Sequence, residues 1–328
     1  MATTESAAVR SLVLPAVALA VAAGGLAAAQ GRFNGDLGSA GAGALVASWV
    51  SYAGTVGMLL LVTVLRRRAA FSVATVRRDG RWWWFAVGTS SIPIVVFTAL
   101  GVPHVGVAVA AVCTVAGQTV AGLAFDARGW GVDTALGLTP RRLLAGITAI
   151  AGLALAVVSG SGSGVGVGLA VGLGVALFLS GLALAIQQAG NGRITQISGD
   201  AVLAGVTSCT GGFVGITAVV GVVAALGRLG EVAMPGADQW WLYLGGPLGA
   251  FITVASAWAV RHLGTFALTL AAVGGQMVTA VVLDVARGVG VRWPTYAAIA
   301  AIAAATLLVV LPQRANAALA HRAPPVSR

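Results

Sequence analysis

The sequence predicts an all-α integral membrane protein of about ten transmembrane helices, arranged as two inverted repeats of five helices each. Hydrophobic residues make up 58% of the 328-residue chain and charged residues only 9%, and the mean hydropathy is +0.96. A soluble fold of this composition could not cover its surface with polar groups. Apolar runs of membrane-spanning length recur along the whole chain, and one motif occurs twice.

The duplicated motif is a Gly-Gln pair at the end of an apolar run, with an aspartate eight residues after the glutamine. It occurs at residues 117–126 and again at 275–284. Offsets of 157 or 158 residues also pair Asn34 with Asn191 and the tryptophans at 83–84 with those at 240–241. The sequence therefore predicts two copies of one structural unit.

The first repeat is expected to cover residues 1–159. Its apolar runs lie at about 11–29, 41–65, 82–100, 105–125 and 143–159. The first run has a competing interpretation as a signal peptide cleaved near Ala29. Its polar end has an internal twin at 187–192, however, and this favours a retained helix.

The second repeat is expected to cover residues 165–312, after a Ser/Gly linker at 160–164 and before a cytoplasmic tail at 313–328. Its apolar runs lie at about 165–186, 201–226, 241–259, 264–283 and 295–312. Because each repeat holds an odd number of spans, the second copy enters the membrane from the opposite side.

The charges orient the chain. The chain contains nineteen arginines, nine acidic residues and no lysine, and the formal net charge is +10. With both termini in the cytoplasm, all arginines except Arg32, Arg228, Arg287 and Arg292 lie in cytoplasmic segments, as the positive-inside rule requires. This distribution favours a lipid bilayer over nucleic acid as the partner of the basic residues.

Several kinds of chemistry are excluded by the residues present. Without lysine the chain can form neither an ordinary P-loop nor a Schiff base. Cys113 and Cys209 lie in apolar runs, and the three histidines are far apart, so no disulfide, metal or cofactor site is indicated. We expect a protein that is not an enzyme and holds no metal or cofactor.

Polar side chains inside apolar runs are the candidates for a site. Gln118 and Gln276 are amides at mid-span, where an unpaired polar group is costly. They are expected either to face one another across a central cavity or to join helices by hydrogen bonds. Further cavity candidates, with helix capping or core packing as the alternatives, are Gln30, Asn34, Gln187, Gln188, Asn191, Trp49 and Trp258.

The acidic residues of the motif, Asp126 and Asp284, lie at helix ends near Arg128 and Arg287. An ion pair or gate closure is the favoured interpretation, and ion coupling is the alternative. His104 and His262 precede the fourth and ninth runs and are further gating candidates, since histidine changes charge near neutral pH.

The Gln-x-x-x-Asn pattern at 30–34, the tryptophan pair before the third run and the Gly-Gln motif with its aspartate resemble the YdcZ-type family of the drug/metabolite transporter superfamily. The resemblance covers residues 12 to 312 and implies a bacterial inner-membrane protein with two family repeats fused in one chain. It also implies a central substrate cavity and alternating access.

The expected function is a secondary transporter or facilitator that exports a small organic metabolite or drug. The alternative is a non-transporting scaffold or a channel-like protein. Small residues at 164, 168 and 172 leave open a homodimer.

Overall fold

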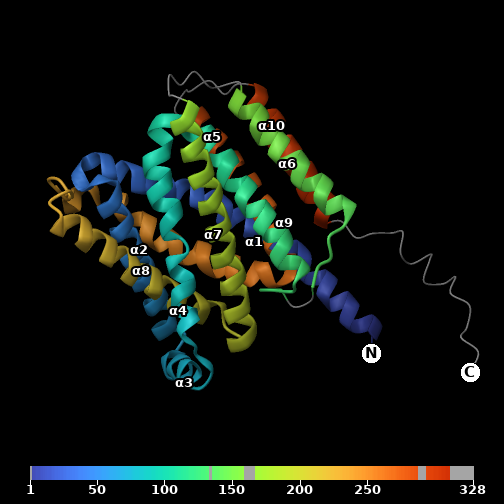
Figure 1. The fold of residues 1–328 in the computed structure, drawn as a ribbon. Helices are drawn as coiled ribbons and strands as arrows, with labels where there is room; N and C mark the ends of the chain where they lie inside the picture. Colours follow the sequence, from blue (N-terminus) through green and yellow to red (C-terminus); the bar gives the residue numbers. More distant parts are fainter. Residues whose placement is uncertain (1, 133–134, 159–166, 287–292, 311–328) are drawn as a thin grey trace, which may run out of the picture.

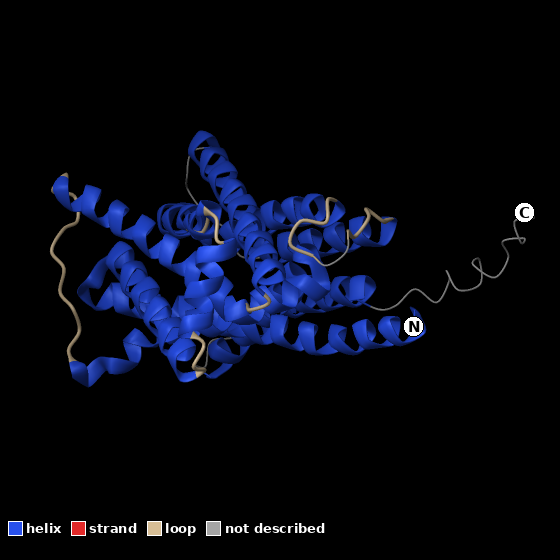
Figure 2. Cartoon of the chain, turned by 90° about the horizontal axis from the view of Figure 1, so that it is seen from below, coloured by secondary structure: helices blue, strands red, loops and turns tan. Residues whose placement is uncertain are grey.

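The computed structural model describes residues 2–132, 135–158, 167–286 and 293–310, and these residues form helices joined by loops, without a strand (Figure 2). The α-helices are α1 (Ala2–Leu37), α2 (Gly43–Leu65), α3 (Ala69–Asp79), α4 (Trp82–Thr89), α5 (Ile92–Ala127), α6 (Pro140–Val158), α7 (Val167–Ser198), α8 (Ala201–Ala225), α9 (Gly245–Ala286) and α10 (Trp293–Val310). Two short helices, η1 (Gly38–Ala42) and η2 (Ala237–Leu244), precede α2 and α9.

The chain is an integral membrane protein. Within the described residues, four stretches are long and apolar enough to cross a bilayer: 12–65, 171–198, 201–225 and 237–279. The first stretch contains α1, whose Ala16, Ala20 and Ala23 are fully buried. Ala16 and Ala20 pack in one hydrophobic cluster with residues of α9, so the expected first span belongs to the core.

One expected boundary is wrong. The sequence predicts a break between residues 100 and 105, but α5 continues through this stretch from Ile92 to Ala127. A glycine and a proline lie in this stretch, at 101 and 103, and membrane helices tolerate both residues where neighbouring groups satisfy the freed backbone. The chain instead interrupts the helix at Ser90 and Ser91, between α4 and α5.

The second half has its break where the sequence predicts one. Gly264 interrupts α9 with φ 81° and ψ 164°, and this left-handed conformation is one that glycine adopts without strain. The kink divides α9 into residues 245–263 and 265–286, close to the expected boundary at 259–264.

The helices of the two halves pack against each other in a reciprocal pattern. Helix α1, the first helix of the first half, packs along α9 of the second half. Helix α7, the first helix of the second half, packs along α5 of the first half. Likewise α2 packs on α9, α4 on α8, and α2 on α8. Figure 1 shows α6 and α10 side by side at one edge of the bundle and α3 at one end of it.

Close glycine crossings occur at matching positions in the two long helix pairs. A Cβ at Gly117 of α5 would collide with the carbonyl oxygen of Phe178 in α7, and a Cβ at Gly275 of α9 would collide with that of Val21 in α1. Gly181 and Gly24 meet Thr114 and Ala272 in the same way. The glycine of the duplicated motif is therefore a packing residue that lets two backbones touch.

Candidate functional site

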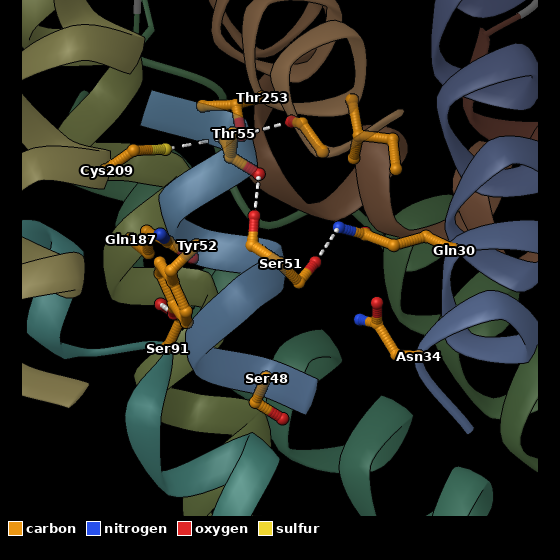
Figure 3. A pocket seen from close by; sticks show the side chains of 12 residues that line it. Gln30, Asn34, Ser48, Ser51, Tyr52, Thr55, Ser91, Gln187, Cys209 and Thr253 are labelled. Carbon is orange, nitrogen blue, oxygen red and sulfur yellow. Dashed lines mark hydrogen bonds between the residues drawn. The ribbon is translucent and has the colours of Figure 1, made fainter. Parts of the chain in front are cut away.

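A pocket of about 230 Å³ lies among α1, α2, α7, α8, α9 and the start of α5, so both halves of the chain contribute to it (Figure 3). Its lining residues are Gln30, Asn34, Ser48, Ser51, Tyr52, Thr55, Ser91, Gln187, Cys209, Gly249, Ile252 and Thr253. Most of these side chains are polar, yet none is charged. The pocket therefore offers hydrogen bonds without a net electrostatic preference.

Two side chains on one side of the pocket hold α1, α2 and α9 together. Gln30 Nε2 donates to the carbonyl oxygen of Gly245 at 2.9 Å and to Ser51 Oγ at 3.3 Å. Thr55 Oγ1 contacts the carbonyl oxygens of Ser51 and Gly246, each at 2.9 Å. These bonds tie the first turn of α9 to α1 and α2.

Two further pairs of polar side chains in the pocket contact each other. The Tyr52 hydroxyl is hydrogen-bonded to Ser91 Oγ, which itself donates to the carbonyl oxygen of Gly88. Cys209 Sγ lies 3.7 Å from Thr253 Oγ1. Each pair joins helices from different parts of the chain, and together they shape the wall opposite Gln30.

Two carboxamides of the pocket are not engaged. Asn34 on α1 and Gln187 on α7 make no hydrogen bond to any residue that the structure describes. Figure 3 shows them on opposite sides of the pocket, with α2 and its Tyr52 and Ser51 between. Each amide can donate two hydrogen bonds and accept two, so both are available to a molecule in the pocket.

Hydrophobic side chains close the pocket at one end. Along α2, Ser48, Ser51 and Thr55 line the pocket, and Leu59 follows one turn later in a buried cluster. The other members are Val56, Met58 and Val62 of α2, Val202, Val206 and Cys209 of α8, and Ala250 and Val254 of α9. We name this cluster the apolar seal.

An ion pair lies beyond the apolar seal. Arg66, at the end of α2, has Nη1 3.2 Å from Asp200 Oδ1. Asp200 is the N-cap of α8 and also accepts from the backbone N–H of Val202 at 2.8 Å. The pair therefore joins the ends of α2 and α8 on the far side of the seal from the pocket.

A second ion pair lies at the kink of α9. Asp126 is completely buried, forms an ion pair with Arg142 of α6 and accepts from the backbone N–H groups of Thr265 at 2.6 Å and Phe266 at 3.1 Å. It therefore caps the segment of α9 that begins after Gly264. The Arg142 guanidinium also lies 5.2 Å from the centre of the Phe266 ring. We call these contacts the α9 clasp.

The partner of Asp126 differs from the one that sequence proximity indicated. Arg128 was the expected partner, but its Nη1 donates to the carbonyl oxygen of Ala124, and Arg142 pairs with the carboxylate instead. Helix α6 brings Arg142 back over the end of α5, a tertiary contact that spacing alone cannot reveal.

Gln118 and Gln276 are not brought together in the pocket. Gln118 is buried on α5, next to the glycine that packs on α7, whereas Gln276 is exposed on α9. Neither residue lines the pocket. The arrangement in which they face each other across this cavity is therefore not the one the chain adopts.

The remaining candidates lie at several places. Gln188 accepts from Thr269 Oγ1 at 3.5 Å, and Asn191 is buried with its Oδ1 unpaired in the described structure. Trp49 donates to Thr217 Oγ1 at 2.9 Å, and Trp258 stacks on His262 at 4.5 Å between ring centres. His104 and Asp284 lie in α5 and α9, but their side chains are outside the described residues.

Sequence reasoning missed the hydroxyl groups of the pocket. Ser48, Ser51, Tyr52 and Thr55 recur at intervals of three and four residues along α2, which places them on one helix face. This spacing was the available signal. No group of three metal-ligating side chains occurs in the part of the chain that the structure describes.

Comparison with known proteins gives three findings. Residues 15–155 and 173–311 each match the family described as "Putative inner membrane exporter, YdcZ". A curated relative, "Inner membrane protein YdcZ" of Escherichia coli (strain K12), is 28% identical over 134 residues, which are 87% of that protein and 41% of this chain. A protein of known crystal structure is similar over 95% of this chain and 99% of its own, with a TM-score of 0.66 and 14% identity, which shows a shared fold alone.

Proposed function

Since this chain belongs to the family described as "Putative inner membrane exporter, YdcZ", with two family repeats in one polypeptide, we propose that it is a secondary transporter that exports a small organic molecule by alternating access. In this proposal ten membrane-spanning segments form two inverted repeats of five. The substrate binds in the pocket between the repeats, and the two sides of the pocket open in turn.

The reciprocal packing of the helices supports inverted repeats. Each major contact between the halves is converted into another one when equivalent helices are exchanged. The exchanged pairs are α1 with α7, α2 with α8, α4 with the first segment of α9, α5 with its second segment, and α6 with α10. The glycine crossings follow the same exchange, since Gly117 and Gly275 meet residues that are themselves 157 apart. Two equivalent halves around one site can exchange two conformations of similar free energy by rocking.

The distribution of arginines supports an orientation with both termini in the cytoplasm. This orientation puts the Arg66–Asp200 pair, the α9 clasp and the apolar seal on the cytoplasmic side of the pocket. Asn34 and Ser48 then lie toward the outside. In this proposal the structure represents a conformation whose cytoplasmic side is closed by the apolar seal.

The observation that carries the proposal is the order of features along α2. Polar residues line the pocket up to Thr55, the buried Leu59 of the apolar seal follows one turn later, and Arg66 ends the helix in an ion pair. A scaffold does not require a polar pocket between its halves, and an open channel would not be closed by packed aliphatic side chains at one end.

The repeat also indicates which residues would close the outer side. At an offset of 157, Leu59 corresponds to Ile216, Val202 to Leu45, and Val206 to Trp49. In the inward-open state of this proposal, these residues form an equivalent seal between α2 and α8.

Side-specific labelling tests the proposal. Single cysteines are placed at Asn34 and at Val202 in a background without Cys113 and Cys209, and a membrane-impermeant thiol reagent is applied to one side at a time. Asn34→Cys should react from outside. Val202→Cys should react only from the cytoplasmic side, where Val202 lines a second pocket with Arg66 and Asp200, and it should react faster once the seal opens.

Bridging the seal provides the control for that measurement. A Leu59→Cys/Val202→Cys pair joined by a bifunctional thiol reagent should abolish transport and leave outer labelling of Asn34→Cys unchanged in the same background. Labelling of Asn34→Cys from both sides despite the bridge would indicate a channel. Labelling from neither side would contradict a transport pathway and favour a scaffold.

A further inference from the structure

The chemistry of the pocket restricts what it can bind. Its lining consists of hydroxyl, amide, thiol and aliphatic groups, with no charged side chain among the described residues that form it. An ion that leaves water for such a site gains no opposite charge in return, and this costs several kcal/mol. The pocket should therefore discriminate against ionised solutes.

The free carboxamides disfavour solutes that are wholly apolar. Asn34 and Gln187 face the pocket without a partner among the described residues, and Gln30 uses its Nε2 atom on Ser51 and Gly245. An apolar solute that displaced water from Asn34 and Gln187 would leave both amides unsatisfied, at a cost of about 1–3 kcal/mol for each buried group. A favourable solute must both donate and accept hydrogen bonds.

The volume sets the size of the solute. The pocket measures about 230 Å³, which is the space of about eight waters at about 30 Å³ each. Covalently bonded atoms lie closer together than waters, so a solute can place at least that many non-hydrogen atoms there. The pocket is smaller than the usual range for drug-sized ligands, about 300–1,000 Å³, so its size favours small solutes over bulky amphipathic compounds.

From these three restrictions we propose that the pocket binds a small uncharged solute rich in hydroxyl or amide groups, with the carboxamides of Asn34 and Gln187 as direct ligands. This inference rests on the proposed transport function, because it takes the pocket as the substrate site. It predicts a selectivity that depends on charge at constant size.

Matched solutes measure that selectivity. The full-length protein in proteoliposomes is assayed by counterflow with a hexitol, the corresponding hexonate and the 1-amino-1-deoxyhexitol. A second set compares a primary amide with the carboxylate and the ammonium compound of the same carbon skeleton. In at least one set the neutral member should exchange faster than both charged members by about tenfold or more.

Acidic variants test whether the selectivity arises in the pocket. Asn34→Asp adds a carboxylate there and should raise the rate of the ammonium member relative to the neutral member by about tenfold. Gln187→Glu should do the same from the other side of the pocket and serves as the second variant. Gln239→Glu makes the same kind of change in η2, outside the lining of the pocket, and should leave the ranking unchanged.

Each result decides between the inference and the proposed function. Faster exchange of a carboxylate or an ammonium compound in the wild type would overturn the inference and leave transport intact. Neutral preference that neither acidic variant alters would overturn the assignment of Asn34 and Gln187 as ligands. Exchange of no solute by correctly folded protein would overturn the inference together with the proposed function.

Discussion

Removing the carboxylate of Asp126 should be among the most destabilising single changes in the protein. Asp126→Ala leaves the Arg142 guanidinium buried without its partner, and breaking a buried pair in this way costs about 3–5 kcal/mol. It also removes the acceptor for two N–H groups at the start of the second segment of α9. Loss of such a cap costs about 0.5–2 kcal/mol, so the total loss should be at least about 3 kcal/mol.

The free energy of unfolding in mixed detergent micelles measures this loss. Arg142→Met should cost less than Asp126→Ala, because the carboxylate keeps its two backbone donors. The double variant should cost less than the sum of the two single variants by about 0.5–3 kcal/mol, since it leaves no unpaired charge. Asp36→Ala is the control, since it removes the half-exposed Arg32–Asp36 pair, which is worth about 0–1 kcal/mol.

Two results would refute this reasoning. If Asp126→Ala cost no more than Asp36→Ala, the α9 clasp would not contribute to stability. If the two single changes were additive, Asp126 and Arg142 would act independently, and their contact in the structure would carry no interaction energy.

Three further predictions concern the helix contacts. Gly117→Ala should strongly destabilise the protein in the same unfolding assay, because the added methyl meets the backbone of α7, whereas Gly31→Ala, with open space around it, should stabilise it by about 0.5–1 kcal/mol. Equal effects of the two substitutions would contradict the close crossing. Asp200→Ala removes the ion pair with Arg66 and also the N-cap of α8, whose loss alone should cost about 0.5–2 kcal/mol, whereas Asp200→Asn keeps the cap and loses only the ion pair with the half-exposed Arg66, at a cost of at most about 1 kcal/mol. Equal losses would assign the stabilisation to the pair. Trp49→Phe should cost about 0.5–1.5 kcal/mol by removing the hydrogen bond to Thr217, and no loss in a Thr217→Val background would support that cause.

The sequence was sufficient for the features that follow from repetition and hydropathy. Apolar runs predicted the positions of α2, α6, α8 and α10 to within a few residues, because a span must cover the bilayer thickness. The boundary within α5 failed for a local reason. A Gly-Val-Pro sequence ends many soluble helices, but in a membrane the helix can continue through it.

The pocket could be predicted only in part. Gln30, Asn34 and Gln187 were identified because each half of the chain repeats them, whereas the hydroxyls of α2 were overlooked in a run that reads as apolar. Gln118 and Gln276 were expected to line the site because they are amides at mid-span and occur in both halves, but neither lines the pocket. The repetition at these positions follows from the glycines beside them, which must pack closely on α7 and α1. Repetition identifies equivalent places in a fold, and packing accounts for it as well as binding does.

The α9 clasp breaks the symmetry of the two halves, and this has a consequence for the proposed cycle. Residues 157 and 158 positions after Arg142 are Ile299 and Ala300, so the second half has no arginine at the equivalent place. A state closed on the other side would therefore lack this ion pair and be less favoured by whatever free energy the pair contributes. Asp126→Asn, which weakens the pair and keeps an oxygen for the cap, should shift the population toward the inward-open state. In the proposed orientation, labelling of Val202→Cys from the cytoplasmic side should then become faster, and an unchanged rate would mean that the clasp stabilises the fold without biasing the cycle.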